Sequence, residues 1–249
     1  AMTIPDFARY RLFVEPALAE GYRLPLAREQ ANYLISVLRM KQDETVLVFN
    51  GRDGEWLAAI AVEGRKQASL TVLRQTKPQP AAPDLHYLFA PLRHARLDYM
   101  AQKAVEMGAG VIQPVLTRRT QVSRLNLDRM RANAVEAAEQ CGILSLPEIR
   151  AEQGLEAALA ALEPDRLLVF CDEALAQESP VAALAEAKPG PLAVLIGPEG
   201  GFDDAERRLI MARPNTLAIS LGPRILRADT AAVAALALVQ AVLGDWPRG

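Results

Sequence analysis

Residues 194–206 read Val-Leu-Ile-Gly-Pro-Glu-Gly-Gly-Phe-Asp-Asp-Ala-Glu, and this stretch decides the fold. The apolar start predicts a buried strand, and the glycines that follow let the backbone approach a ligand closely. Asp203 then predicts a helix N-cap, with Glu206 completing a capping box. In open α/β sheets, such loops at the carboxyl ends of strands form the ligand crevice. The alternative is a tight turn whose glycines serve geometry alone.

This loop does not have the composition of a phosphate loop. It contains neither Gly-Lys-Ser/Thr nor the G-x-G-x-x-G pattern, which argues against a nucleotide-dependent dehydrogenase. Its acidic residues Glu199, Asp203 and Asp204 would repel a phosphate group. The sequence therefore favours a neutral or cationic ligand.

A second strand-to-helix junction follows in residues 219–230, Ile-Ser-Leu-Gly-Pro-Arg-Ile-Leu-Arg-Ala-Asp-Thr. We expect the strand to end at the Gly-Pro pair and the next helix to be capped by Asp229 or Thr230. Two apolar residues precede Arg227, so we expect this loop to pack inward and to bring Arg227 into the crevice. The alternative is that Asp229 only caps the helix.

The last helix is expected to begin at Thr230, and residues 231–243 carry no charge. A helix that is apolar all round must be covered on all sides, and this one is too short to span a bilayer. We therefore predict that one face packs on its own sheet and another on a second subunit.

The rest of the chain predicts two domains of different composition. Strands alternating with helices after residue 83 indicate a parallel sheet covered by helices on both faces, an α/β fold. Before residue 76, short β-rich segments with one helix at 28–38 indicate a small β-barrel-like module. Residues 77–83, rich in proline, form a linker. The predicted domains are therefore 1–76 and 84–249.

We expect strands at 11–14, 44–49, 55–60, 68–73, 85–92, 111–116, 166–170, 192–196 and 216–221, and helices at 96–107, 127–141, 155–162, 181–187, 203–212 and 230–243.

Composition and charge narrow the function. The 249 residues are 51% hydrophobic and 23% charged, which excludes a disordered chain. The 28 Lys and Arg against 30 Asp and Glu exclude a uniformly basic nucleic-acid coat. Residues 76–135, however, hold nine Lys and Arg against four Asp and Glu. Clustered positive charge binds polyanions such as nucleic acid, and a solvated helix face is the alternative.

Other residue types indicate a cytoplasmic protein without a metal. Cys141 and Cys171 form no CxxC pair, which is typical of a reducing cytosol. With only His86 and His94, the chain has almost no ligands for zinc. Residues 1–20 lack the apolar core of a signal peptide, and no membrane-spanning run is present.

The two glycine-containing loops in tandem resemble the paired signature of the ribosomal RNA small subunit methyltransferase E family. Residues 195–202 and 221–231 carry this resemblance, and supporting similarities lie at 37–40, 49–51, 102–108, 136–142 and 147–149. Enzymes of this family are SPOUT-class and use S-adenosylmethionine to methylate N3 of a uridine in 16S ribosomal RNA. The resemblance implies a PUA-like N-terminal β-barrel that binds RNA, a C-terminal domain with a deep trefoil knot, and a homodimer.

The resemblance also implies roles for particular residues. For the chemistry, the Arg-x-Asp spacing at the crevice leads us to expect that Arg227 stabilises the developing uracil oxyanion, with Asp229 orienting it or taking the proton. Phosphates of the 16S ribosomal RNA, or of the 30S subunit, would be held by Arg39, Arg118, Arg119 and Arg124. The cofactor pocket would be lined by Phe170, Cys171, Ile196, Gly197, Pro198, Glu199, Gly200, Gly201, Leu221, Gly222, Ile225 and Leu226.

Three positions depart from the family pattern. Asp229 stands where the family usually has Glu, residues 143–144 stand where an arginine is common, and residues 117–120 replace Ser-Glu-Arg. Two other functions remain open. One is a SPOUT methyltransferase that acts on tRNA or on a ribose 2′-hydroxyl, and the other is a non-catalytic RNA-binding protein of ribosome assembly.

Overall fold

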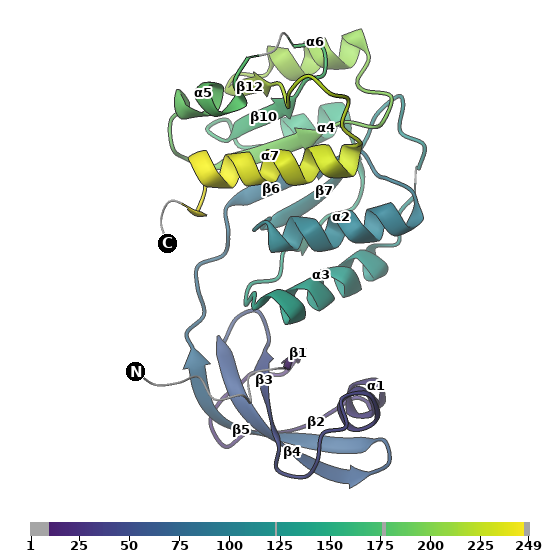
Figure 1. Cartoon of the computed structure of the whole chain (residues 1–249), viewed down its shortest axis with the longest axis vertical. Coiled ribbons are helices and arrows are strands. Elements are labelled where there is room, and N and C mark those ends of the chain that lie inside the picture. The colour runs from purple at the N-terminus through teal and green to yellow at the C-terminus, as the bar shows by residue number, and fades with distance from the viewer. Residues whose placement is uncertain (1–9, 123, 176–177, 247–249) are drawn as a thin grey trace. The chain divides into compact units, whose positions relative to one another are not determined.

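Two units divide the chain in the computed structural model, which describes residues 10–122, 124–175 and 178–246 (Figure 1). Unit 1 comprises Ala1–Ala81 together with Ala138–Leu146, and unit 2 comprises Ala82–Ala137 and Pro147–Gly249. The short segment 138–146 therefore belongs with the N-terminal part of the chain, although it lies far from it in sequence.

Unit 1 is built on a mixed sheet of five strands in the order β1-β3-β4-β5-β2. Strand β1 pairs with β3 in parallel, and the other pairs are antiparallel. The four strands that the sequence predicts here are confirmed, whereas the three-residue β2 is an addition. The bounds are β1 Arg11–Phe13, β2 Arg23–Pro25, β3 Thr45–Phe49, β4 Glu55–Gly64 and β5 Gln67–Lys77.

The predicted helix at 28–38 is confirmed in position but not in form. It consists of the α-helix α1, Arg28–Asn32, followed by the π-helical turn η2, Tyr33–Val37. The wider turn is closed by the N–H of Leu38, which donates to the carbonyl of Tyr33 at 2.9 Å. Its apolar side still faces the sheet, where Leu34 is fully buried in the core of unit 1.

Arg11 joins the sheet of unit 1 to segment 138–146. The helix α3, Leu127–Cys141, ends in this segment, and Arg11 donates to the carbonyl oxygens of Ala138, Glu139 and Ile143. The same guanidinium lies 4.5 Å from the centre of the Phe49 ring and binds Glu55 through Nε at 3.0 Å. Arg11 thus donates to carbonyls at and just after the end of α3, a helix end that also attracts positive charge.

Unit 2 contains a sheet in which every pairing is parallel, as the sequence predicts. Its order is β12-β10-β11-β6-β7-β8, and β9 pairs with β7 beside this path. The carboxyl ends of β10, β11 and β12 therefore lie next to one another. The bounds are β6 Leu85–Phe89, β7 Val111–Leu116, β8 Glu148–Ile149, β9 Gln153–Gly154, β10 Leu167–Cys171, β11 Leu192–Ile196 and β12 Thr216–Ile219.

Helices cover both faces of this sheet, since every residue of β6 and β11 is buried. On one face, β6, β10 and β11 form a core with α4 and α6. On the other, α2 and α7 lie in front of β6 and β7 in Figure 1. The bounds are α2 His94–Glu106, α4 Leu155–Ala160, α5 Pro180–Ala185, α6 Asp204–Ala212 and α7 Ala228–Val242. In the described ranges, no helix is long and apolar enough to cross a membrane.

The two helix starts at the glycine-containing loops differ from each other. At α6 the predicted capping box is confirmed: Asp203 accepts from the N–H of Glu206 at 2.8 Å, and Glu206 accepts from that of Asp203 at 3.2 Å. At α7 the prediction is wrong, because the helix begins at Ala228 with Arg227 in the N-cap position and no side-chain cap. Asp229 therefore lies inside the first turn, where its carboxylate is available to another partner.

Candidate active site

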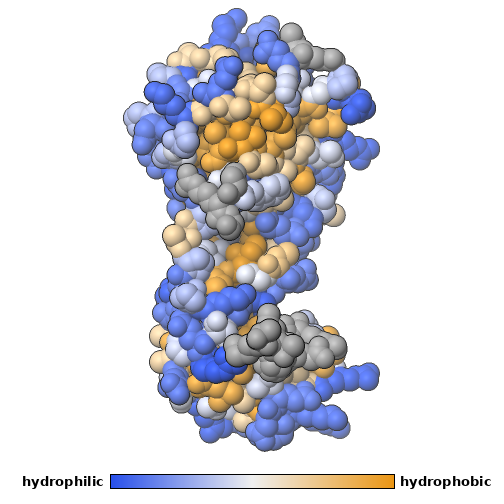
Figure 2. Space-filling view, turned by 60° about the vertical axis from the view of Figure 1, so that its left-hand side comes forward, coloured by the Kyte–Doolittle hydropathy of each residue, from blue (hydrophilic) through white to orange (hydrophobic). Residues whose placement is uncertain are grey.

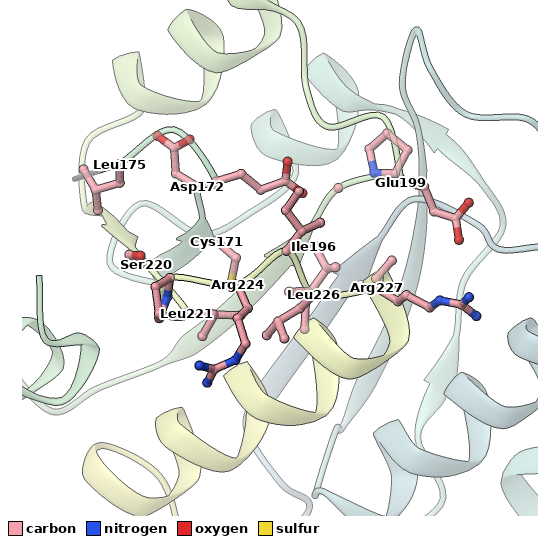
Figure 3. A pocket seen from close by; sticks show the side chains of 18 of the residues that line it. Cys171, Asp172, Leu175, Ile196, Glu199, Ser220, Leu221, Arg224, Leu226 and Arg227 are labelled. Atoms are coloured by element: carbon pink, nitrogen blue, oxygen red, sulfur yellow. The ribbon is translucent and has the colours of Figure 1, made fainter. Parts of the chain in front are cut away.

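A cavity of about 750 Å³ lies where the ends of β10, β11 and β12 meet. Its size falls within the ~300–1,000 Å³ that is usual for small-molecule sites. The loop from β11 to α6 forms one wall, and the loop from β12 to α7 forms another (Figure 3). Predicted residues that line it are Cys171, Ile196, Gly197, Pro198, Glu199, Leu221, Gly222, Ile225, Leu226 and Arg227.

Three of the predicted lining residues lie outside this cavity. Phe170 is only 1% exposed, because the alternation of β10 turns its ring into the core, against the ring of Phe202 at 5.4 Å between centroids. Gly200 lines a smaller neighbouring recess, and Gly201 is not in the lining of either. Lining residues that sequence reasoning missed include Arg96, Glu173, Leu175, Ser220, Pro223, Arg224, Ala228 and Ala231.

Two positions in the walls of the cavity require glycine for geometric reasons. A Cβ at Gly197 would meet the Phe202 ring at 2.7 Å, so glycine allows the strand end to pack closely there. Gly222 has a φ of +96°, a backbone conformation that other residues rarely adopt. These glycines therefore do serve the geometry of the loops, which was the alternative to a ligand site. The same two loops also enclose the cavity.

An ion-pair cluster closes one edge of the cavity. Arg96, from the first turn of α2, binds Glu199 of the β11–α6 loop and also Asp229 of α7. Its Nη2 lies 2.9 Å from Asp229 Oδ1, and its Nε lies 3.3 Å from Oδ2. The Arg96 guanidinium holds the pKa of the Asp229 carboxyl below its usual value, and the two carboxylates raise the pKa of Arg96. Asp229 is therefore a weak proton acceptor.

The expected inward packing of the loop before Arg227 is wrong, because Ile225 is 98% exposed and Arg227 is itself exposed. Arg227 nevertheless lines the cavity, and its side chain is uncommitted. Figure 3 shows it at the same end of the cavity as Glu199, whereas Arg224 extends elsewhere. Among the residues that the structure describes, no acceptor binds the Arg227 guanidinium, while the Asp229 carboxylate binds Arg96 and the N–H of Thr230. A free guanidinium in a cavity is available to stabilise negative charge on a ligand.

The remaining groups of the cavity suit a neutral or cationic ligand. Burial raises the pKa of the Cys171 thiol to about 12, so this group stays protonated and is not a nucleophile. Asp172 is buried and bound to Arg207 at 2.7 Å. Over the described ranges, no group of three or more His, Cys, Asp or Glu side chains could hold a metal ion.

The predicted phosphate-binding arginines are distributed over both units of the chain. Arg118 is exposed and binds Asp203 at 3.1 Å, and Arg119 donates to the carbonyl oxygen of Gly200 beside the cavity. Arg124 is exposed just before α3 in unit 2. Arg39, in unit 1, is exposed with a left-handed φ of 56°. Strained backbone of this kind gathers at functional sites.

Comparison with known proteins gives two family models that match this chain. An RNA methyltransferase domain matches residues 77–240, and an RNA methyltransferase PUA domain matches residues 26–73. A ribosomal RNA small subunit methyltransferase E from Rickettsia conorii is 31% identical over 172 residues, which cover 69% of this chain and 70% of the relative.

Two solved structures are similar over nearly the whole chain. The first is a putative methyltransferase from Legionella pneumophila in complex with its cofactor SAM, with 30% identity and a TM-score of 0.83, covering 94% of this chain and 98% of that one. The second is a ribosomal RNA small subunit methyltransferase E from Neisseria gonorrhoeae bound to S-adenosyl methionine, with 26% identity and a TM-score of 0.84, covering 95% and 99%.

Proposed function

The chain belongs to the ribosomal RNA small subunit methyltransferase E family, and we propose that it methylates N3 of a uridine in 16S ribosomal RNA with S-adenosylmethionine as the methyl donor. The observation that carries this proposal is the cavity between the two glycine-containing loops. Related proteins with the same fold hold this donor.

The residues around the cavity fit such a donor. The donor supplies a methyl group on a positively charged sulfur, which the neighbouring carboxylates of Glu173 and Glu199 tolerate. Backbone groups of residues 221–226 would meet the adenine on one side, and residues 196–199 would line the other. The end of β10, at Cys171 and the following Asp172, would provide the third wall.

Arg227 and Asp229 have different roles in the proposed chemistry. N3 of uracil carries a proton, so negative charge develops on the uracil oxygens as this proton passes to solvent water. Arg227 is placed to stabilise that charge, and the loops hold the acceptor in line. Because Arg96 lowers the pKa of Asp229, we assign this carboxylate to orienting the first turn of α7 rather than to taking the proton.

The finer architecture of the family is also part of the proposal. We infer that the mixed sheet of unit 1 is the PUA-like barrel that positions RNA, and that the loops of unit 2 are tied in a deep trefoil knot. Knots are rare in proteins, and only the family resemblance supports one here. We also place the protein in the cytoplasm, since its two cysteines, Cys141 and Cys171, form no CxxC pair.

Methyl transfer to 30S subunits, compared with free 16S ribosomal RNA, tests the function. We expect nucleoside mass spectrometry to find N3-methyluridine at one position. A methylated ribose, or transfer to tRNA instead, would support the other SPOUT activities. A protein that transfers no methyl group and binds no S-adenosylmethionine in calorimetry would be an RNA-binding assembly factor.

Neutralising Arg118 and Arg119 is expected to weaken the salt dependence of RNA binding. Both side chains are exposed near the cavity. Each phosphate contact that is lost reduces the slope of log K against log salt by roughly 0.7–0.9. Filter binding of Arg118→Ala/Arg119→Ala over a salt series measures this slope. Lys188→Ala, an exposed change before β11, is the control, and an unchanged slope in the double variant would place the contacts elsewhere.

We propose a homodimer through α7. One face of this helix is buried on its own unit, whereas residues including Ala234, Ala237 and Leu238 are only partly buried. Figure 2 shows a broad hydrophobic area on unit 2, on the side toward α5 and the end of α7. An uncharged helix face of this kind needs a cover.

Sedimentation at micromolar concentration is expected to show a dimer. Leu238→Glu should convert it to a monomer, because a charge would be buried in the interface. Met211→Glu, at an exposed position of α6, should leave the dimer intact. A wild-type monomer at this concentration would rule out the proposed assembly.

A further inference from the structure

Arg96 connects the two loops of the cavity through their carboxylates. It binds Glu199 on one loop and, with two nitrogens at 2.9 and 3.3 Å, Asp229 on the other. The Arg96 side chain is 33% exposed and that of Asp229 only 20%, so this pair is partly shielded from water. One guanidinium therefore occupies both carboxylates at this edge of the cavity.

The free state of Arg227 requires an explanation beside these carboxylates. Arg227 lies two residues before Asp229 and at the same end of the cavity as Glu199 (Figure 3). Hydrogen bonds between arginine and carboxylate are strong, so an unoccupied carboxylate within reach would attract the Arg227 guanidinium. Arg227 nevertheless binds no acceptor among the described residues, and both carboxylates have a partner in Arg96.

We propose that Arg96 is a positioning residue that keeps Arg227 free for the acceptor. It holds Glu199 and Asp229 and so prevents them from drawing Arg227 into an internal ion pair. This inference rests on the proposed function, which assigns Arg227 to the negative charge on the uracil. It also explains how a site with two acidic side chains presents an uncommitted positive charge.

A purely structural clamp predicts a different mutational pattern. If Arg96 only held the two loops together, neutralising Glu199 and Asp229 in an Arg96 variant would not restore turnover. If Arg96 protects Arg227, neutralising the same carboxylates in an Arg96 variant removes the competitors and restores turnover. The two accounts therefore predict different turnover for the triple variant Arg96→Ala/Glu199→Gln/Asp229→Asn: no recovery for a structural clamp, and recovery for a residue that protects Arg227.

Steady-state kinetics with 30S subunits separate these accounts. We expect Arg96→Ala to lower kcat by about tenfold or more with little change in KM, and Arg96→Lys to retain an intermediate kcat. In Arg96→Ala/Glu199→Gln/Asp229→Asn we expect kcat to recover by about fivefold or more over Arg96→Ala. The control is Arg129→Ala, which removes a comparable two-nitrogen ion pair with Asp98 of α2 outside the cavity and should keep wild-type turnover.

Two results would overturn the proposal. One is a wild-type kcat in Arg96→Ala, and the other is a triple variant that has the same melting temperature as Arg96→Ala and is no more active. A crystal structure of Arg96→Ala, or of Arg96→Gln should the alanine variant not fold, tests it without any substrate. We expect Arg227 to be bound to Glu199 or Asp229 there, and an unpaired Arg227 would contradict the inference. Absence of methyl transfer by the wild type would count against the proposed function instead, while this structural result would still decide the role of Arg96.

Discussion

Replacing Arg227 by alanine is expected to lower methyl transfer by about 10²–10³-fold, the usual effect of removing one group that stabilises charge in a transition state. The side chain lines the cavity and has no partner in the described chain, so its loss disturbs no ion pair of the fold. Transfer of a tritiated methyl group to 30S subunits measures the effect. Calorimetry should show nearly unchanged binding of S-adenosylmethionine, because the loss concerns the acceptor.

Two comparisons give this prediction its controls. Arg208→Ala, at an exposed position of α6, should keep normal turnover. Asp229→Asn should be milder than Arg227→Ala, since Asp229 is bound to Arg96 and its lowered pKa makes it a poor base. Near-normal turnover of Arg227→Ala would reject its assignment, and a loss in Asp229→Asn as large as in Arg227→Ala would restore Asp229 as the proton acceptor.

Replacing Arg11 by methionine is expected to lower the free energy of unfolding by about 3–5 kcal/mol, because it leaves the buried carboxylate of Glu55 without its partner. The side chains of Arg11 and Glu55 are only 9% and 3% exposed. The carbonyls at the end of α3 lose their donor as well. Thr76, whose hydroxyl donates to Glu55 at 2.8 Å, offsets part of this loss. Urea unfolding measures the change in the free energy of unfolding.

Arg23→Met is the matched control for Arg11→Met. Arg23 also binds a glutamate, Glu63, but these side chains are 63% and 43% exposed. Exposed ion pairs contribute about 0–1 kcal/mol, so this variant should be nearly as stable as the wild type. Equal losses in the two variants would show that Arg11 does not hold segment 138–146 against the sheet.

Local patterns in the sequence predicted most of the elements of the fold. The order of strands and helices, the parallel sheet and the capping box of α6 all depend on neighbours within a few residues, which periodicity and turn residues reveal. The end of α3 was not predicted to join unit 1, because this contact depends on Arg11, 127 residues away from Ala138. The strands β8 and β9 have two residues each, too few to show any period.

The candidate site was predicted less completely than the fold. The two loops were recognised because their glycines, prolines and flanking strands are local signals, and both line the cavity. Arg96 had no such signal, since it lies 103 residues from Glu199 and 133 from Asp229. The start of α7 was misplaced because Asp229 and Thr230 are good cap residues, whereas here Asp229 serves an ion pair. The knot and the identity of the donor came only from the family resemblance, whereas the uncharged last helix also predicted a second subunit.

A crystal structure with S-adenosylmethionine bound tests the central claim most directly. We predict density for the donor between residues 196–199 and 221–226, with its methyl group facing the end of the cavity where Glu199 and Arg227 lie. Density at any other place, or a bound state in which these two loops do not contact the donor, would contradict it.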